Sequence, residues 1–158
     1  MDEAITASEH RRLRRIADFQ FGAGAGEALF PDREELRAKR TSSGRPEQIH
    51  VPAGRLVTQN TDGRFTISVR AGRRLAAAFE PPTLRVEVGD ESEPYVRDGK
   101  NAFAKFVRTA DEGIRPGDEV LVTHDGSLLG VGRAELSGRA MYDFGTGMAV
   151  KIRSGIDD

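Results

Sequence analysis

The sequence predicts an α+β protein made of two small domains, residues 1–81 and 82–158. Three observations lead to this prediction: an amphipathic helical pattern near the N-terminus, short β-type segments between turn-forming residues, and the pair Pro81-Pro82 between the halves. We expect a small α+β domain first. A pseudo-barrel of mixed β-strands with short helices should follow it. A chain of 158 residues with 37% hydrophobic content can bury two such cores.

The first helix is expected to begin near Ser8 and to continue to Phe21. Its apolar positions recur with helical spacing, at Leu13, Ile16, Ala17 and Phe21. The opposite side carries four arginines, Arg11, Arg12, Arg14 and Arg15. Such a run is typical of a solvated helix face, and contact with phosphates is the alternative.

A glycine-alanine stretch, residues 18–30 (DFQFGAGAGEALF), follows the helix. It does not match a dinucleotide-binding loop, because Glu27 stands where the third glycine should fall, and no Lys-Ser/Thr pair follows as in a P-loop. We expect the small residues to let the chain pass close to the sheet. The large apolar residues around them, Phe19, Phe21, Leu29 and Phe30, should then pack as core. A backbone-amide nest for an RNA phosphate is the alternative.

The rest of the front half reads as short strands and one helix. Strands are expected within residues 35–41, 48–51, 55–60 and 64–69, with a hairpin turn at Asp62-Gly63. The alanine-rich segment 71–79 should be helical and should end before Pro81-Pro82.

The pattern of the back half predicts five strands and two short helices. The strands are expected within residues 83–89, 101–107, 115–125, 128–136 and 147–155. The short helices are expected within 93–100 and 137–144, and a hairpin turn at Gly126-Ser127. So many strands in about 75 residues favour a small, strongly curved sheet or barrel.

Composition excludes several classes of protein. The absence of cysteine removes disulfides, thiolate catalysis and cysteine-bound metal clusters. The acidic, polar N-terminus does not resemble a secretory signal, and no apolar run approaches the ~20 residues that span a bilayer. We therefore expect a cytoplasmic protein without a membrane partner.

Charge is distributed unevenly along the chain. Residues 1–80 contain 14 Lys and Arg against 11 Asp and Glu, and the remainder contains 10 against 14. This balance is not the strong basic excess of a protein that binds nucleic acid by bulk charge. Any contact with RNA must therefore come from a compact patch.

No pattern indicates catalysis. His10, His50 and His124 stand singly, without metal-binding spacing, and are expected at the surface or in turns. No G-x-S-x-G motif surrounds a serine, and the acidic pairs Asp90-Glu91 and Asp111-Glu112 suit solvated loops. We expect no enzyme activity, no cofactor and no metal site.

Binding residues are a better-supported hypothesis. The segment Arg97 to Lys105 contains Arg97, Lys100, Asn101 and Lys105, and strand alternation would place Phe103 and Lys105 on one face. An exposed ring beside a cation suits an RNA end, where bases unstack onto aromatic side chains. The alternative is that Phe103 is core and Lys105 merely solvated. Lys151 and Arg153 alternate on the last strand and could extend the patch.

The back half resembles a PUA domain, an RNA-binding module of pseudouridine synthases and archaeosine transglycosylases. The resemblance runs over residues 83–155 and rests on PYVRDGKNAFAKFV, IRPGDEVLVTHDGSLLGVGRAEL and MAVKIRSG, in that order. The segment IADFQFGAGAGEALFP is similar to the one that precedes the PUA domain in archaeal tRNA-guanine transglycosylases and archaeosine synthases. The resemblance implies Gly99, Lys100 and Asn101 as RNA contacts.

The family's enzymes also contain a TIM-barrel catalytic domain with a nucleophilic aspartate and a zinc site of cysteines and histidine. This chain is too short and contains no cysteine to supply them. The resemblance therefore implies a noncatalytic archaeal protein that binds tRNA or another structured RNA. Its partner would be a separately encoded catalytic transglycosylase subunit of the archaeosine tRNA-modification pathway. A PUA-like protein adaptor without RNA affinity is the alternative.

Overall fold

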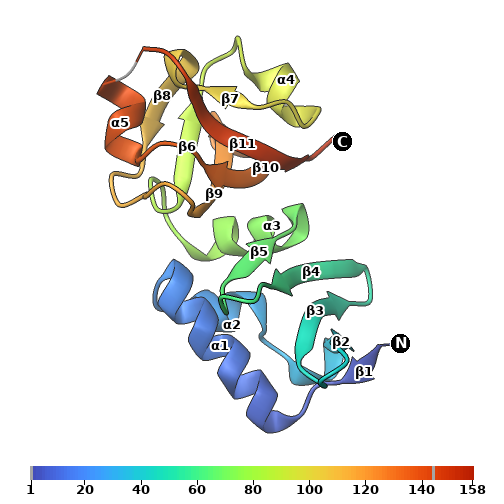
Figure 1. The fold of residues 1–158 in the computed structure, drawn as a ribbon. Helices are drawn as coiled ribbons and strands as arrows, with labels where there is room; N and C mark the ends of the chain where they lie inside the picture. The colour runs from blue at the N-terminus through green and yellow to red at the C-terminus, as the bar shows by residue number, and fades with distance from the viewer. Residues whose placement is uncertain (1, 144) are drawn as a thin grey trace. The chain divides into compact units, whose positions relative to one another are not determined.

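The computed structural model describes residues 2–143 and 145–158, and the α+β prediction is confirmed (Figure 1). The chain divides into two compact units, Met1–Ala78 and Phe79–Asp158. Each unit has its own sheet, of five strands in the first and six in the second. The boundary between residues 81 and 82 stays a prediction.

The first unit is an antiparallel sheet in the order β1-β2-β3-β4-β5, with α2 packed between α1 and α3. Its helices are α1 (Ala7–Phe21), α2 (Ala25–Leu29) and α3 (Val69–Ala78), with a 3-10 turn at Arg33–Glu35. Its strands are β1 (Glu3–Ala4), β2 (Arg37–Arg40), β3 (Pro46–Val51), β4 (Gly54–Gln59) and β5 (Phe65–Ile67). The core centres on Phe30 and Phe65, whose buried rings meet edge to face at 5.7 Å. The hairpin turn expected at Asp62-Gly63 does join β4 and β5.

Helix α1 begins at Ala7, one residue before the start expected near Ser8, because Thr6 is its N-cap. The Thr6 hydroxyl accepts from the Glu9 backbone N–H at 3.1 Å, and the Glu9 carboxylate accepts from the Thr6 backbone N–H at 3.0 Å. This reciprocal capping box satisfies two otherwise unpaired donors. The predicted apolar face is largely correct: Leu13, Ala17 and Phe21 are buried and Ile16 is half-buried.

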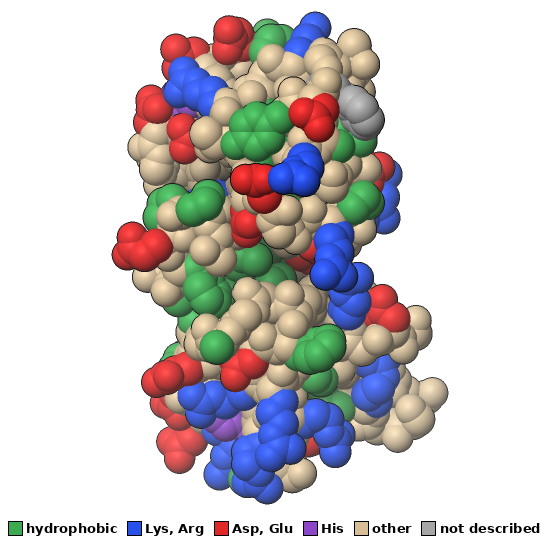
Figure 2. All heavy atoms as spheres, turned by 90° about the vertical axis from the view of Figure 1, so that its left-hand side faces the viewer, with side chains coloured by type: hydrophobic (Ala, Val, Ile, Leu, Met, Phe, Trp, Pro, Cys, Tyr) green, Lys and Arg blue, Asp and Glu red, His purple; other side chains and the backbone are tan. Residues whose placement is uncertain are grey.

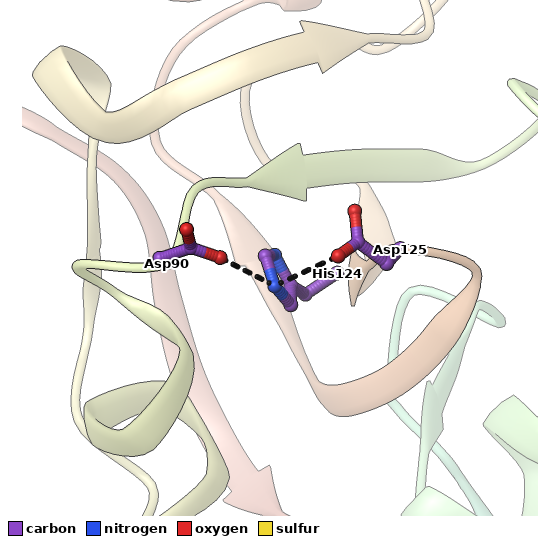
Figure 3. Close-up of side chains that lie close together, drawn as sticks. All are labelled: Asp90, His124 and Asp125. Atoms are coloured by element: carbon purple, nitrogen blue, oxygen red, sulfur yellow. Dashed lines mark ion pairs between the residues drawn. The ribbon is translucent and has the colours of Figure 1, made fainter.

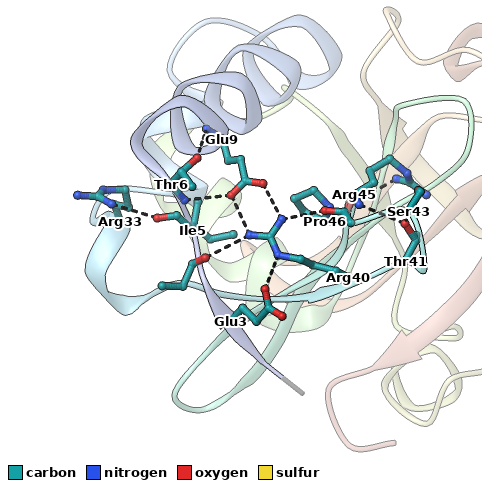
Figure 4. A network of polar contacts seen from close by, with 12 residues as sticks. Glu3, Ile5, Thr6, Glu9, Arg33, Arg40, Thr41, Ser43, Arg45 and Pro46 are labelled. Atoms are coloured by element: carbon teal, nitrogen blue, oxygen red, sulfur yellow. Dashed lines mark hydrogen bonds and ion pairs between the residues drawn. The ribbon is translucent and has the colours of Figure 1, made fainter.

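Glu9 also belongs to an ion-pair network that ties the start of α1 to β2 (Figure 4). The Arg40 guanidinium donates to Glu9 Oε2 at 2.6 Å and Oε1 at 2.9 Å, and its Nε lies 2.9 Å from Glu3 Oε2. The hydrogen bond from Arg40 lowers the pKa of Glu9 from its ordinary 4.5 to about 2. A forked guanidinium-carboxylate pair of this kind is among the stronger side-chain interactions.

We expect Glu9→Gln to cost about 1–2 kcal/mol of stability at pH 7, since glutamine keeps the capping box but loses the ion pair. A lowered folded-state pKa contributes stability above pH 4.5 that is lost as the pH falls toward 2. The difference between wild type and variant should therefore shrink over that interval in urea unfolding curves. Glu27→Gln, at an exposed position of α2, is the control, and its free energy of unfolding at pH 7 should stay within about 0.5 kcal/mol of the wild type. A constant difference from pH 7 to pH 2 would contradict this account.

The glycine-alanine stretch forms a tight connection between α1 and α2, and its ends meet the sheet as expected: Gln20 exchanges hydrogen bonds with the Phe65 backbone of β5, and the Phe30 ring packs on that of Phe65. The small residue Gly26 meets α1, because a Cβ there would lie 2.3 Å from the backbone oxygen of Arg14. Gly24 adopts a φ of +97°, which favours glycine. Phe21, Leu29 and Phe30 are buried as expected. Phe19 is not core; its side chain is 95% exposed, because it lies on the solvent side of α1.

The geometry of this stretch does not favour the phosphate-nest alternative. The Gly26 N–H already donates to Asp18 Oδ1 at 2.7 Å, and the Ala25 N–H donates to the Gly22 oxygen at 3.1 Å. Amides committed to internal acceptors are not free for a phosphate. The stretch therefore has a packing role.

The second unit is a mixed sheet in the order β7-β11-β10-β9-β6-β8, in which β6 runs parallel to β9 and the other pairs are antiparallel. Bulges in β10 and β11 help the sheet curve toward a barrel. Its strands are β6 (Arg85–Val88), β7 (Ala102–Phe103), β8 (Val107–Ala110), β9 (Glu119–His124), β10 (Ser127–Ala134) and β11 (Met148–Gly155). The short helices are α4 (Glu93–Arg97) and α5 (Gly138–Asp143), with a 3-10 turn at Ala104–Phe106. Phe144, at the end of the predicted second helix, lies outside the described residues.

Two local predictions in this unit are wrong. Residues 101–107 are not one strand, because the 3-10 turn at Ala104–Phe106 separates β7 from β8. The β9-β10 turn is formed by Asp125 and Gly126, with φ of 48° and 84°, and not by Gly126-Ser127. Two residues with positive φ match the twist of a hairpin, and an Asp-Gly pair suits such a turn.

The core of the second unit lies inside the curved sheet. It is lined mainly by small and β-branched residues, among them Val86, Val88, Val120, Val122 and Val150. Strand β9 is buried along its whole length, as expected for a strand covered on both faces. No helix within residues 2–143 and 145–158 is long and apolar enough to cross a membrane.

Candidate nucleic-acid interface

The second unit contains a pocket of about 440 Å³ beside α4 and β7. It is lined by Glu91, Ser92, Tyr95, Lys100, Asn101, Phe103 and Phe106. Three of the residues singled out from the sequence, Lys100, Asn101 and Phe103, therefore lie together. The volume is in the range of sites that hold small organic groups.

Two aromatic side chains are unusually open at this pocket. The side chain of Tyr95 is 62% exposed and that of Phe103 is 44% exposed, although most large hydrophobic residues of the unit are buried. The prediction that Phe103 points outward is confirmed by this exposure, and its alternative as a core residue is wrong. Neighbouring Ala102 and Ala104 are buried, so the alternation holds across the start of the 3-10 turn.

The backbone after α4 places Lys100 next to Tyr95. The Lys100 backbone N–H donates to the Tyr95 backbone oxygen at 2.9 Å, and Gly99 between them has a φ of +88°. A side chain at Gly99 would be strained there, and its Cβ would lie 2.7 Å from Asp158 Oδ2. Gly99 therefore shapes the loop.

Asn101 anchors this loop to the last strand. Its Oδ1 accepts from the Ile152 backbone N–H at 2.9 Å, which leaves its side-chain NH₂ group as the available donor. Strand β11 also passes close to the end of α4, because a Cβ on Gly155 would lie 2.3 Å from the Arg97 oxygen. The loop that holds Lys100 is thus fixed at both ends.

The predicted cations differ in how freely they can meet a ligand. Lys100 is exposed at the rim of the pocket, and Lys151 is exposed on β11. The Lys105 Nζ lies 5.0 Å from the centre of the Phe106 ring, a cation-π distance. Lys105 is exposed but does not line the pocket itself.

The two predicted arginines are held by carboxylates. Arg97 Nε donates to Asp157 Oδ2 at 2.9 Å, a contact that raises the pKa of the guanidinium. Arg153 pairs with the buried carboxylate of Glu119. Lys151 and Arg153 do share the outer face of β11, with Ile152 buried between them. Because its partner is buried, Arg153 would lose a strong contact by turning to a phosphate.

Sequence reasoning missed Tyr95 and Phe106 as pocket residues. Tyr95 was included in a short helix without a role, and strand alternation placed Phe106 on the face opposite Phe103. The 3-10 turn breaks that alternation and brings both rings to one pocket. The sequence did offer one signal for Tyr95: an aromatic residue on a very short helix, shortly before a glycine-lysine pair.

The arginines of α1 form a separate basic surface in the first unit. Arg11, Arg12 and Arg15 are exposed and Arg14 is half-buried. Figure 2 shows Lys and Arg side chains gathered over this helix, at the bottom of the view. The expectation of a solvated face fits this exposure, and phosphate contact stays an open alternative.

The histidines differ from the expectation of surface or turn positions. His10 and His50 are half-buried, and His10 Nε2 lies 2.8 Å from the Phe30 oxygen. His124 is buried at the end of β9, and it is the largest departure from the prediction. Its neighbours are described below.

Comparison with known families decides what the two units are. Residues 11–82 match the patch-forming domain C2 of tRNA-guanine transglycosylase, and residues 84–156 match the PUA domain. This is a PUA-domain protein that resembles the C-terminal region of archaeal tRNA-guanine transglycosylase. The family resemblance seen in the sequence is therefore confirmed.

The curated relatives that match this chain across both units are archaeal proteins named tRNA-guanine(15) transglycosylase. The protein of Pyrococcus furiosus is 46% identical over 148 residues, which are 92% of this chain and 25% of that relative. The one of Methanothermobacter thermautotrophicus is 39% identical over 152 residues, 95% of this chain and 23% of the relative. The chain spans about a quarter of the length of these curated relatives.

Solved structures share the fold of the whole chain. A hypothetical protein, PH0734.1, from Pyrococcus horikoshii OT3 superposes with a TM-score of 0.76 at 22% identity, covering 100% of this chain and 96% of the other. A conserved PUA domain protein from Thermoplasma acidophilum superposes with a TM-score of 0.69 at 21% identity. The match covers 100% of this chain and 95% of the other. At these identities the likeness concerns the fold alone.

Proposed function

We propose that the chain is a noncatalytic tRNA-binding protein whose PUA domain holds an unpaired RNA end. The observation that carries this proposal is the pocket in which exposed Tyr95 and Phe103 stand beside Lys100. Exposed rings offer stacking surfaces to unpaired bases, and a cation at the rim can meet the adjoining phosphate. The relatives' name supports tRNA as the RNA.

The polar groups of the pocket suit this role as well. The side-chain NH₂ group of Asn101 is a donor for a base edge, because its oxygen is held by Ile152. Glu91 and the buried Ser92 also line the pocket and add hydrogen-bond acceptors. A site with stacking rings and few oriented polar groups favours a single base over a duplex, which would need a longer basic surface.

The catalytic step would belong to another chain. We infer a separately encoded transglycosylase subunit as the partner, and the relatives' name supports the kind of chemistry that such a subunit would supply. In that arrangement the protein supplies tRNA recognition, and the partner supplies the base-exchange chemistry. A protein adaptor without RNA affinity is the competing function.

Lys100→Ala is expected to weaken tRNA binding and to lower the slope of log K against log salt by about one unit, because one phosphate contact is lost. The measurement is a fluorescence titration of tRNA at several salt concentrations. Lys39→Ala is the matched control, since Lys39 is an exposed lysine on β2 of the other unit. Its affinity and slope should equal those of the wild type.

The competing outcomes are distinct. If Lys100→Ala stays folded and keeps both the affinity and the salt slope, the pocket does not bind the RNA. If the unaltered protein binds no tRNA even at low salt, the adaptor function is favoured. If Arg12→Ala and Arg15→Ala reduce binding instead, the RNA contacts α1.

A further inference from the structure

A buried histidine faces three carboxylates beside the loop between β6 and α4, part of which lines the pocket. His124, at the end of β9, has a side chain only 8% exposed. Its Nε2 lies 3.0 Å from Asp90 Oδ1, 3.2 Å from Asp125 Oδ2 and 3.3 Å from Glu93 Oε2. Figure 3 shows Asp90 and Asp125 pointing at the imidazole from two sides.

The other ring nitrogen orients the imidazole. His124 Nδ1 lies 2.8 Å from the Val88 backbone oxygen, so Nδ1 carries a proton and donates it there. In the neutral ring this leaves the Nε2 lone pair aimed at three negatively charged groups. A backbone carbonyl that holds one imidazole nitrogen is also the usual support for a histidine that binds a metal through the other.

The distances suit a small coordination sphere. Four ligands at ~2.1 Å from an ion such as Zn²⁺ lie roughly 3.4 Å apart at the corners of a tetrahedron. The Nε2-oxygen separations of 3.0 to 3.3 Å are close to this, and the ligand atoms of His124, Asp90 and Asp125 all lie within 4.8 Å of one another. These three side chains would supply three ligands after a small adjustment of the two exposed aspartates, which leaves the fourth position of the sphere to water.

The charge balance fits a dication. Arg108 lies 3.2 Å from Asp125 Oδ1 and 3.6 Å from Asp90 Oδ1, and so neutralises one of the three carboxylates. With a neutral imidazole the group then carries two negative charges. At Asp125, Arg108 faces Oδ1 and His124 faces Oδ2, whereas at Asp90 the same oxygen, Oδ1, faces both residues.

We propose that His124, Asp90 and Asp125 form a binding site for a divalent ion of the Zn²⁺ class, with the Glu93 carboxylate adding negative charge beside the imidazole. One imidazole and several carboxylates favour such an ion over Mg²⁺, which prefers oxygen ligands and retains its water. The ion would connect the loop between β6 and α4, which contains Asp90, to the β9-β10 turn, which contains Asp125. Glu91 and Ser92 directly follow Asp90 in the chain and line the pocket, so the ion would hold one of the pocket's walls in place.

A proton on Nε2 is the other way to satisfy this cluster. The hydrogen bond to Val88, followed by the charges of Asp125, Glu93 and Asp90, raises the pKa of His124 against the opposing effect of burial. An imidazolium would then pair with the carboxylates and bind no ion. Direct measurement of ion binding separates the two occupants, independently of the proposed RNA function.

The test uses the full chain without an affinity tag, titrated with Zn²⁺ by calorimetry and with Co²⁺ by visible absorption. We expect one ion per chain and a Co²⁺ spectrum of low coordination number that a hundredfold excess of Mg²⁺ does not abolish. Asp90→Asn and Asp125→Asn should each weaken binding about tenfold or more. Asparagine tolerates the φ of 48° at position 125, so this variant should stay folded.

Glu91→Gln is the matched control, because it removes the same charge from the same loop at a side chain outside the cluster. Its affinity should stay within about twofold of the wild type, a change typical of an exposed charge at a distance. No binding by the unaltered chain at millimolar Zn²⁺ would overturn the proposal in favour of the imidazolium. Equal losses in Glu91→Gln and Asp90→Asn, or displacement of Co²⁺ by Mg²⁺, would also overturn it.

Discussion

Phe103→Ala is expected to weaken tRNA binding by ~1–3 kcal/mol, about 5- to 150-fold, while the salt slope stays unchanged. The ring is 44% exposed at the pocket, so its loss should remove a stacking surface and no charge. The same exposure predicts a small effect on stability, since a half-exposed ring leaves no enclosed cavity when it is removed. Thermal melts and tRNA titrations on the same protein measure both quantities.

Phe19→Ala is the control for Phe103→Ala. Phe19 is 95% exposed on α1 of the C2 unit, and its removal should change neither the melting temperature nor the affinity. Phe103→Trp should retain most of the binding, because a larger ring can still stack. A Phe103→Ala protein that binds tRNA with wild-type affinity would refute the stacking role. A loss of ~3–5 kcal/mol of stability, the size expected for a fully buried ring, would contradict the small stability effect and leave the loss of binding explained by unfolding.

Gly26→Ala should destabilise the protein by about 3 kcal/mol or more, through overpacking against a backbone. A Cβ at this position would lie 2.3 Å from the Arg14 oxygen and 2.7 Å from its Cα, and neither atom can turn away as a side chain can. Helix α2 would have to move from α1, and its buried residues Ala25 and Leu29 would lose packing. Urea unfolding at pH 7 measures the loss.

Glu27→Ala provides the comparison within the same helix. Glu27 is exposed on α2, so its replacement should change the free energy of unfolding by no more than about 0.5 kcal/mol. If Gly26→Ala were as stable as Glu27→Ala, the close approach of α1 and α2 would not be essential. The glycine-alanine stretch would then need another explanation.

Much of the candidate site could be predicted from local sequence. Lys100, Asn101 and Phe103 are close together in the chain, and the burial of Ala102 and Ala104 follows from simple alternation. The contribution of Tyr95 and Phe106 to the pocket could not be predicted from local sequence, because it depends on a 3-10 turn and on the docking of α4 against β11. The pairing of Arg97 with Asp157 and of Arg153 with Glu119 joins residues 60 and 34 positions apart, beyond the reach of any local pattern.

The sequence by itself determined the α+β class, most helices and strands, and the family resemblance, because hydrophobic periodicity and turn residues are local signals. The tertiary structure decided which side chains are available to a ligand. Phe19 lies close in sequence to the apolar residues of α1, yet it faces solvent because the helix packs through Leu13, Ala17 and Phe21. His124 and Asp90 are separated by 33 residues and meet only because β6 and β9 lie side by side in parallel. Burial and long-range pairing are properties of the folded chain, and these two properties decide which residues form the candidate sites.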